Sequence, residues 1–468
     1  MIKIKQKLQK NRFSFKKGKS YLLLLLIIFI SVLVISAGVF IYFKVLTSNV
    51  ATNPVVLIGL DGADWHIIDP LIKQGKLPNL RKLIEEGSSG VLQTIKPTKS
   101  PVVWTSIATG KNMLKHGILD WAFVKKNNIE VPYSAGERRV KALWNILSEK
   151  NQTVCVINWF CTYPPDEVNG FLVSDRFRIS VFKYLFNETV TFPPRLKKKI
   201  YPKVVRIKDR KYKKILRKEG IEDYLEKSRR LNIAIPEERL PQLRRSQIYI
   251  LQDKSIENIS LFLLEKFQVD FFATYLRLID TTSHFGSLFV SKDLQIKWQE
   301  ENEKYGMPTP ETENLLYQGM VPFIEPIYTY MDNVVGRIIK RAREDTTFII
   351  VSDHGFNFSK VGYNHYNTPE IPHGIIIMNG PQIKPGYHIE KAHVYDVTPT
   401  LLYLFDIPIG KDMDGKVILE AFNSKFKRRR KVQYIFSYES PQILPKKKRS
   451  KELDKEALEE LRSLGYIK

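Results

Sequence analysis

The chain has 468 residues, 43% of them hydrophobic, which is enough for one large α/β domain or two to three ordinary ones. Its formal net charge of +25 indicates an anionic neighbour, such as nucleic acid, an anionic membrane surface or a phosphate-bearing substrate. The only two cysteines, Cys155 and Cys161, exclude a disulfide framework.

The N-terminus combines a basic segment, 1–20, with the uncharged segment Tyr21–Phe43. At ~1.5 Å per residue the uncharged segment spans roughly 35 Å, enough to cross a bilayer of about 30 Å. It is longer than the usual signal-peptide core of about 7–15 residues, so we predict a single transmembrane helix over 21–43. The basic flank is expected to stay in the cytoplasm, with the rest of the chain on the far side. Many of the lysines would then lie near an anionic membrane surface, which accounts for their positive charge, so we expect no nucleic-acid partner.

The segment Val55–Gly62 reads V-V-L-I-G-L-D-G. Such a short apolar run bounded by glycine is typical of a buried, parallel, central strand. A carboxylate at the carboxyl end of this strand, Asp61, would face the crevice in which open α/β sheets bind ligands. On local evidence alone, Asp61 could equally cap the turn after the strand.

Strand and helix patterns alternate over 54–424, which predicts one catalytic α/β domain with a mostly parallel central sheet and helices on both faces. The predicted helices are 78–87, 102–109, 140–148, 255–268, 327–343 and 398–405. The predicted strands after the first are 153–158, 171–174, 269–280, 346–353 and 374–379.

Three segments depart from this pattern. We interpret 178–250 and 285–320 as insertions or a cap, and 425–468 as a basic tail that ends in an amphipathic helix over 451–464. Lysine and arginine are dense in 195–230. That stretch is either a solvated helical insertion or a face for a membrane surface or anionic substrate.

Aspartates end three of the predicted strands, and histidines follow two of them at short range. Aspartate and histidine without cysteine suit Zn or a similar first-row divalent ion. There are too many candidate ligands for one tetrahedral site and about enough for two ions. Two ions roughly 3.5–4 Å apart would hold the attacking and the leaving oxygen of a displacement at phosphorus. The candidates are Asp61, Asp280, His284, Asp353, His354, His365 and His373.

A nucleophile is expected on the loop T-K-S-P, where Ser100 precedes Pro101 at a predicted helix start. The positive end of a helix favours a bound anion there. A serine hydroxyl needs a metal or a base to become a good nucleophile. In this position Ser100 could equally be the N-cap of the helix.

Several stretches, in this order, resemble the alkaline phosphatase superfamily and in particular its nucleotide pyrophosphatase/phosphodiesterase-like branch. The resemblance covers about residues 54–420, and the last stretch lies at the C-terminus. The stretches are L-I-G-L-D-G, T-K-S-P-V-V-W-T-S-I-A-T-G-K, Y-L-R-L-I-D-T-T-S-H, F-I-I-V-S-D-H-G-F, H-G-I-I-I-M-N-G-P, D-M-D-G and the closing L-R-S-L-G-Y.

This resemblance implies the alkaline phosphatase-like fold, a two-metal site and a role for each candidate. One ion would be bound by Asp61, Asp353 and His354. The other would be bound by Asp280, His284 and a last histidine, for which His365 is favoured over His373 by its spacing. Ser100 would be the nucleophile, and His116 a structural residue outside the metal set.

One departure from the branch concerns the position three residues after the nucleophile, where Val103 replaces the usual asparagine. Lys99 and Lys111 are weak candidates for supplying the missing substrate contact. The sulfatase branch is disfavoured because the chain has no C-x-P-x-R segment.

Our leading hypothesis is a membrane-anchored, two-metal hydrolase of phosphate esters, a phosphodiesterase or phosphatase that acts through a phosphorylated serine. The first alternative is a transferase that moves phosphoester head groups to a lipid or glycan, since the anchor suits a lipid-linked substrate. The second is a non-catalytic surface protein that keeps the fold.

Overall fold

The computed structural model describes residues 53–125, 128–185, 187–206, 240–286, 290–359, 362–365, 371–439, 449–464 and 466–467, together with residues 29 and 31. Apart from those two residues, the predicted membrane segment 21–43 lies outside the described part, as does most of the basic stretch 195–230. None of the helices in the described part is long and apolar enough to cross a membrane. The membrane helix over 21–43 therefore stays a prediction.

A central sheet runs through the compact unit Asn53–Lys468. Nine strands of the described chain form it, in the order β13-β2-β12-β9-β1-β8-β5-β6-β7. The strands from β9 to β6 are parallel, whereas β12 and β7 run antiparallel to their neighbours. The predicted mostly parallel sheet is thus confirmed. Its strands are β1 (Val55–Leu60), β2 (Ser88–Gln93), β5 (Val154–Ile157), β6 (Gly170–Val173), β7 (Thr191–Phe192), β8 (Phe271–Leu276), β9 (Thr347–Val351), β12 (Gly374–Asn379) and β13 (Tyr387–His393).

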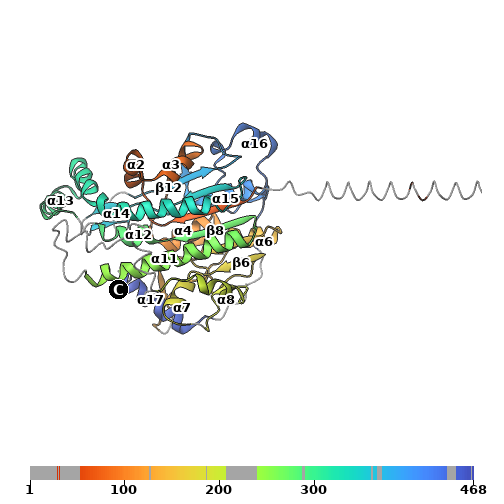
Figure 1. Cartoon of the computed structure of the whole chain (residues 1–468), viewed down its shortest axis with the longest axis horizontal. Helices are drawn as coiled ribbons and strands as arrows, with labels where there is room; N and C mark the ends of the chain where they lie inside the picture. The colour runs from red at the N-terminus through yellow and green to blue at the C-terminus, as the bar shows by residue number, and fades with distance from the viewer. Residues whose placement is uncertain are drawn as a thin grey trace, which may run out of the picture. The chain divides into compact units, whose positions relative to one another are not determined.

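Helices cover both faces of the sheet, as Figure 1 shows for α11 and α14 on one of them. Successive side chains of a strand point to opposite faces, so Val56 and Ile58 of β1 enter one hydrophobic core and Val55 and Leu57 the other. The first core is covered by α2 (Trp65–Lys73), α3 (Pro78–Glu85), α11 (Leu240–Lys266) and α14 (Pro310–Ile339), and the second by α4 (Ser100–Thr109), α6 (Leu143–Glu149) and α15 (Val397–Leu404).

The shorter elements connect these layers. The helices are α5 (Met113–His116), α7 (Phe177–Phe182), α8 (Leu196–Ile200), α12 (Leu278–Ser283), α13 (Lys292–Tyr305), α16 (Ser424–Arg429) and α17 (Lys451–Leu464), with 3-10 turns at Tyr201–Lys203, Val394–Asp396 and Leu419–Ala421. The remaining strands pair in twos: β3 (Ala122–Val124) with β4 (Glu130–Pro132), β10 (Asn357–Ser359) with β11 (Gly362–Asn364), and β14 (Ile409–Gly410) with β15 (Tyr434–Ile435).

Three predicted elements differ from the structure. The helix predicted over 255–268 is the end of α11, which begins at Leu240. The strand predicted over 269–280 ends at Leu276, and Asp280 lies in the first turn of α12. The helix predicted over 327–343 begins much earlier, at Pro310, and contains Pro322 and Pro326. Because proline removes a helical hydrogen bond, the sequence favoured a later start. The long helix also fills much of the predicted cap 285–320.

The C-terminal helix α17 packs against the same unit. It coincides with the amphipathic helix predicted over 451–464 and buries Leu453, Ala457 and Leu458. It contacts α7, which lies in the predicted insertion 178–250, and strand β4. The described residues after 425 therefore lie in the compact unit Asn53–Lys468.

Candidate active site

The site begins where two neighbouring parallel strands end. Asp61 directly follows β1, and Asp353 comes two residues after β9, its neighbour in the sheet. Strands that run parallel present their carboxyl ends at the same edge, so the two side chains meet there. Asp280 joins them from α12, where its backbone N–H donates to the carbonyl of Asp61 at 3.0 Å.

Gly62 permits this close approach. Its φ is +72°, a left-handed conformation that favours glycine, and a Cβ atom there would lie 3.0 Å from Cα of Asp280 and 2.7 Å from the ring of Phe356. The glycine after the first aspartate of the motif L-I-G-L-D-G therefore lets α12 lie against the end of β1.

Two groups of side chains bring ligand atoms within 4.8 Å of one another. One comprises Asp61, Asp353 and His354, and the other Asp280, His354 and His365. All five side chains are at most 2% exposed. These groups share His354, so the described residues form one continuous cluster in which two ions could lie side by side.

His284 extends the second group. Its Nε2 lies 3.3 Å from Oδ1 of Asp280, and the corresponding distance from Nε2 of His365 is 3.6 Å. The ring of His365 stacks on that of His354 with centroids 3.6 Å apart. Three imidazoles thus surround the Asp280 carboxylate.

The donors of this cluster suit divalent ions. In each of the three carboxylates one oxygen accepts a hydrogen bond, while the other, Oδ1 of Asp61, Oδ1 of Asp280 or Oδ2 of Asp353, is buried without a hydrogen-bond partner in the described chain. A buried unsatisfied carboxylate oxygen is costly unless a cation binds it. The hydrogen-bond donors are, in the same order, Tyr275, Tyr466 and the backbone N–H of Gly62.

Two histidines are oriented as metal ligands. Nδ1 of His354 lies 3.0 Å from the carbonyl of Gly355, and Nδ1 of His365 lies 2.7 Å from the carbonyl of Thr98. A carbonyl can only accept, so both rings donate from Nδ1, and their Nε2 atoms lie toward the carboxylates. Such a bond to the outer nitrogen is the usual way in which proteins orient metal-binding histidines.

The pKa shifts in the cluster also favour a bound cation. Burial, followed by repulsion from Asp353 and Asp280, raises the pKa of Asp61 well above its usual value. Burial also tends to raise the pKa of Asp280, but the nearby His284 and His365 outweigh it and the pKa is lowered. Burial, with repulsion from His354, lowers the pKa of His365, which keeps that ring neutral. A neutral imidazole at His365 beside carboxylates that repel one another is a state that a cation binds.

Ser100 is the first residue of α4, and the N-cap is Lys99. The Ser100 hydroxyl is fully buried and has no hydrogen-bond partner among the described residues, so it does not cap the helix. Two residues earlier, the hydroxyl of Thr98 donates to the carbonyl of His365, whose ring contacts the Thr98 carbonyl in return. This reciprocal pair fixes the serine loop beside the second ligand group.

His373, the alternative to His365, is outside both ligand groups. Its side chain is exposed, and its Nδ1 accepts a hydrogen bond from the backbone N–H of Thr94 at 3.2 Å. The geometry therefore favours His365. His116 also lies outside the groups, because Ser106 contacts its Nε2 at 3.0 Å and Ile118 donates to its Nδ1.

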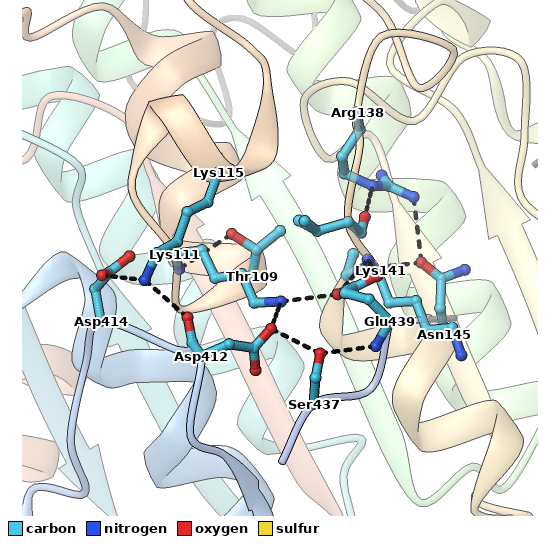
Figure 2. Close-up of polar contacts among 12 residues, drawn as sticks. Thr109, Lys111, Lys115, Arg138, Lys141, Asn145, Asp412, Asp414, Ser437 and Glu439 are labelled. Carbon is cyan, nitrogen blue, oxygen red and sulfur yellow. Dashed lines mark hydrogen bonds and ion pairs between the residues drawn. The ribbon is translucent and has the colours of Figure 1, made fainter. Parts of the chain in front are cut away.

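The two lysines suggested as substrate contacts have other partners. Nζ of Lys99 forms an ion pair with Asp120 at 2.5 Å. Nζ of Lys111, which is 2% exposed, binds Asp412 at 2.6 Å and Glu439 at 2.8 Å (Figure 2). Lys111 thus joins the motif D-M-D-G to the end of α4, and its charge is balanced without a substrate.

Sequence reasoning missed the tyrosines and three buried arginines beside the site. Arg176 and Arg178 follow β6, and Arg277 follows β8 directly, at the same sheet edge as Asp61. They line a cavity of about 40 Å³ that reaches Asp61 and Asp280. The signal in the sequence that could have identified the arginines is their position just after predicted parallel strands.

The sequence was then compared with known families. The type I phosphodiesterase / nucleotide pyrophosphatase family matches residues 55–391. The chain belongs to this family. The predicted membership in the alkaline phosphatase superfamily, type I phosphodiesterase branch, is therefore confirmed. No curated protein matches the chain in sequence.

Solved structures show the same fold at low sequence identity. A 2-O GAG sulfatase is 10% identical with a TM-score of 0.50, over 79% of this chain and 73% of the other. Human ectonucleotide pyrophosphatase/phosphodiesterase 5 is 11% identical with a TM-score of 0.46, over 79% and 100%. The phosphonate monoester hydrolase from Silicibacter pomeroyi is 12% identical with a TM-score of 0.44, over 78% and 75%. At 10% identity the likeness to the sulfatase structure supports the fold alone.

Proposed function

We propose that the protein hydrolyses phosphate esters with two divalent metal ions, Zn being our first choice, and with Ser100 as the nucleophile. The observation that carries the proposal is the set of three carboxylates, each with one buried oxygen lacking a hydrogen-bond partner in the described chain, at the sheet edge next to the serine loop. Family membership supports phosphoester chemistry for such a site.

Asp61, Asp353 and His354 would hold one ion, and Asp280 with His284 and His365 the other. Bound there, the ions would supply positive charge to the oxygens of the phosphoryl group and favour deprotonation of a nearby hydroxyl. The negative charges of the three aspartates would stabilise a +2 ion at this position.

The residues of the chain then have separable tasks. The Ser100 hydroxyl loses its proton to solvent, and Oγ forms a bond to phosphorus while the bond from phosphorus to the leaving ester oxygen breaks; the leaving oxygen takes up a proton from solvent. Water next attacks the same phosphorus, the bond from phosphorus to Oγ breaks, and the proton lost by the water restores the Ser100 hydroxyl. The start of α4 adds the positive end of its dipole on the side where the phosphoryl oxygens gather charge.

Membrane anchoring is a second part of the proposal. The uncharged segment Tyr21–Phe43 and the basic residues before it support a single-pass anchor with the catalytic unit outside the cytoplasm. A lipid-linked phosphate ester is a substrate that such an anchor would suit. Protease protection of intact cells, with a tag at either end, would test this orientation.

A substrate screen tests the catalytic proposal. Phosphomonoesters, phosphodiesters and sulfate esters are offered to the full-length protein with Zn²⁺, with and without an acceptor alcohol. We expect turnover of phosphate esters that stops with chelator. A preference for sulfate esters would contradict the assignment, products joined to the acceptor would favour the transferase, and a protein without metal or turnover would be the non-catalytic alternative.

A further inference from the structure

The cavity beside the site differs from the metal cluster in its chemistry. It has a volume of about 40 Å³ and is bounded by Asp61, Asp280 and Pro101 on the side of the cluster. The other lining residues are aromatic side chains, Asp175, three arginines and residues of α17, including Glu460. A water needs about 10–15 Å³ by this measure, so roughly three waters, or one small polar group, would fill the space.

Three arginines line this cavity while being almost completely buried. Arg176 is 7% exposed, Arg178 8% and Arg277 4%. The Nε–H of each has no hydrogen-bond partner in the described part of the chain. Leaving a charged donor buried and unsatisfied is costly, so three such donors around one cavity indicate an acceptor that enters it.

Four carboxylates line the cavity with the three arginines. Two of them, Asp61 and Asp280, belong to the metal cluster, where the proposed ions would take up their charge. The other two are Glu460, which accepts from both Arg178 and Arg277, and Asp175. With ions in the cluster, the arginines therefore exceed the remaining two acids by one positive charge. Arg176 contributes most of this excess, because it donates a long hydrogen bond of 3.4 Å from Nη2 to the neutral carbonyl of Tyr133.

We propose that this cavity binds a second anionic group of the substrate, a carboxylate or a phosphate, while the scissile phosphoryl group lies at the metal cluster. This proposal rests on the proposed function, because the cavity lies next to the proposed phosphoesterase site. A neutral or apolar substituent would leave the arginine donors unsatisfied. The volume is too small for a nucleobase or a sugar ring, and the planar fork of arginine matches carboxylate and phosphate oxygens.

Calorimetric titration of the full-length protein with bound Zn²⁺ tests this with three probes. Ethyl phosphate has one anionic group, whereas 2-carboxyethyl phosphate and ethylene glycol bisphosphate each carry a second. We expect at least one of the latter two to bind the wild type tenfold or more tightly than ethyl phosphate. Which of the two gains more would tell a carboxylate from a phosphate preference.

Matched variants locate the effect. Arg176→Gln should reduce the tenfold preference to less than about threefold, whereas Arg343→Gln removes the same charge from an exposed pair with Asp345 and should keep it. Asp175→Asn should increase the preference, since it removes a negative charge from the wall. A folding defect would not tighten binding, so this variant keeps the test valid if Arg176→Gln is unstable.

The outcomes separate the two proposals. Equal binding of all three probes by the wild type, or an unchanged preference in Arg176→Gln, would overturn the anion cavity while leaving the phosphoesterase proposal intact. If no probe binds, both proposals fail. Loss of the preference in Arg176→Gln, with the preference kept in Arg343→Gln, is the result that we expect.

Discussion

The hydroxyl of Tyr466 donates a hydrogen bond to Oδ2 of Asp280 at 2.5 Å, across 186 residues of chain. The same ring stacks on Trp121 at 4.2 Å with an interplanar angle of 6°. Tyr466, the last residue of the stretch L-G-Y, is thereby part of the site. It orients the carboxylate that faces His284 and His365.

Tyr466→Phe should weaken the second metal site. Outer partners of metal ligands are typically worth about 10–100-fold in affinity or activity, so we expect about a tenfold loss of Zn²⁺ affinity in a chelator competition, with the fold intact. Tyr434→Phe changes an exposed tyrosine of the same C-terminal region and is the control. Equal Zn²⁺ affinity in both variants would show that the hydrogen bond to Asp280 does not position the ligand.

Asp353→Asn should have opposite effects with and without metal. Burial raises the pKa of Asp353, and repulsion from Asp353 helps to raise the pKa of Asp61. Two close carboxylates therefore destabilise the metal-free protein. At pH 8 with chelator, we expect the variant to gain about 1–3 kcal/mol in free energy of unfolding over the wild type. With Zn²⁺ it should be the less stable of the two. Denaturant titrations measure both, and Asp345→Asn is an exposed control; a loss of stability in chelator would contradict the interpretation.

His365→Ala and His373→Ala distinguish the two histidines left open by the sequence. His365 is buried with its Nε2 near Asp280, whereas His373 is exposed and accepts a bond from Thr94. Elemental analysis should find about one ion fewer per chain in His365→Ala and the wild-type content in His373→Ala. The reverse pattern would reassign the last ligand.

The ion pairs that Glu460 forms with Arg178 and Arg277 should make the free energy of unfolding depend on pH. Burial tends to raise the pKa of Glu460, but the two guanidinium groups outweigh it and lower the pKa from 4.5 to about 2. A lowered folded-state pKa contributes stability that is present above the unfolded pKa and is lost as pH falls through the folded one. The contribution is on the order of 3 kcal/mol.

Denaturant titrations in chelator from pH 7 to pH 2 would measure this contribution. The deficit of Glu460→Gln relative to the wild type should be constant above about pH 5 and shrink toward pH 2. Glu459→Gln, on the exposed side of α17, should show no such trend. A deficit that grows in acid would mean that the ion pair does not lower the pKa of Glu460.

The sequence was sufficient for the sheet core and much of the site. Apolar runs before Asp61 and Asp353 predicted buried parallel strands, and the aspartates meet at one edge because those strands are neighbours. Asp280 was also selected, but its helix α12 was not, since one short turn has no periodicity to read.

The rest depends on contacts between distant parts of the chain. Nothing local in Tyr275 or Tyr466 distinguishes them from ordinary core or surface residues, and the one local signal for Arg176 is its place just after a strand. Only the fold brings them to the edge of the sheet. Lys111 illustrates the converse, because a lysine near the predicted nucleophile suggested substrate contact, while Asp412 and Glu439, some 300 residues later, neutralise it.

The most direct test of the central claim is a rapid-quench reaction of the Zn²⁺-loaded protein with a phosphate ester that it turns over, followed by mass spectrometry of the digested chain. We predict a phosphate on Ser100, and in Ser100→Ala neither that adduct nor more than about a thousandth of the wild-type rate, with both ions retained. Phosphate-ester hydrolysis that survives in Ser100→Ala, or a phosphate on another residue, would contradict the account.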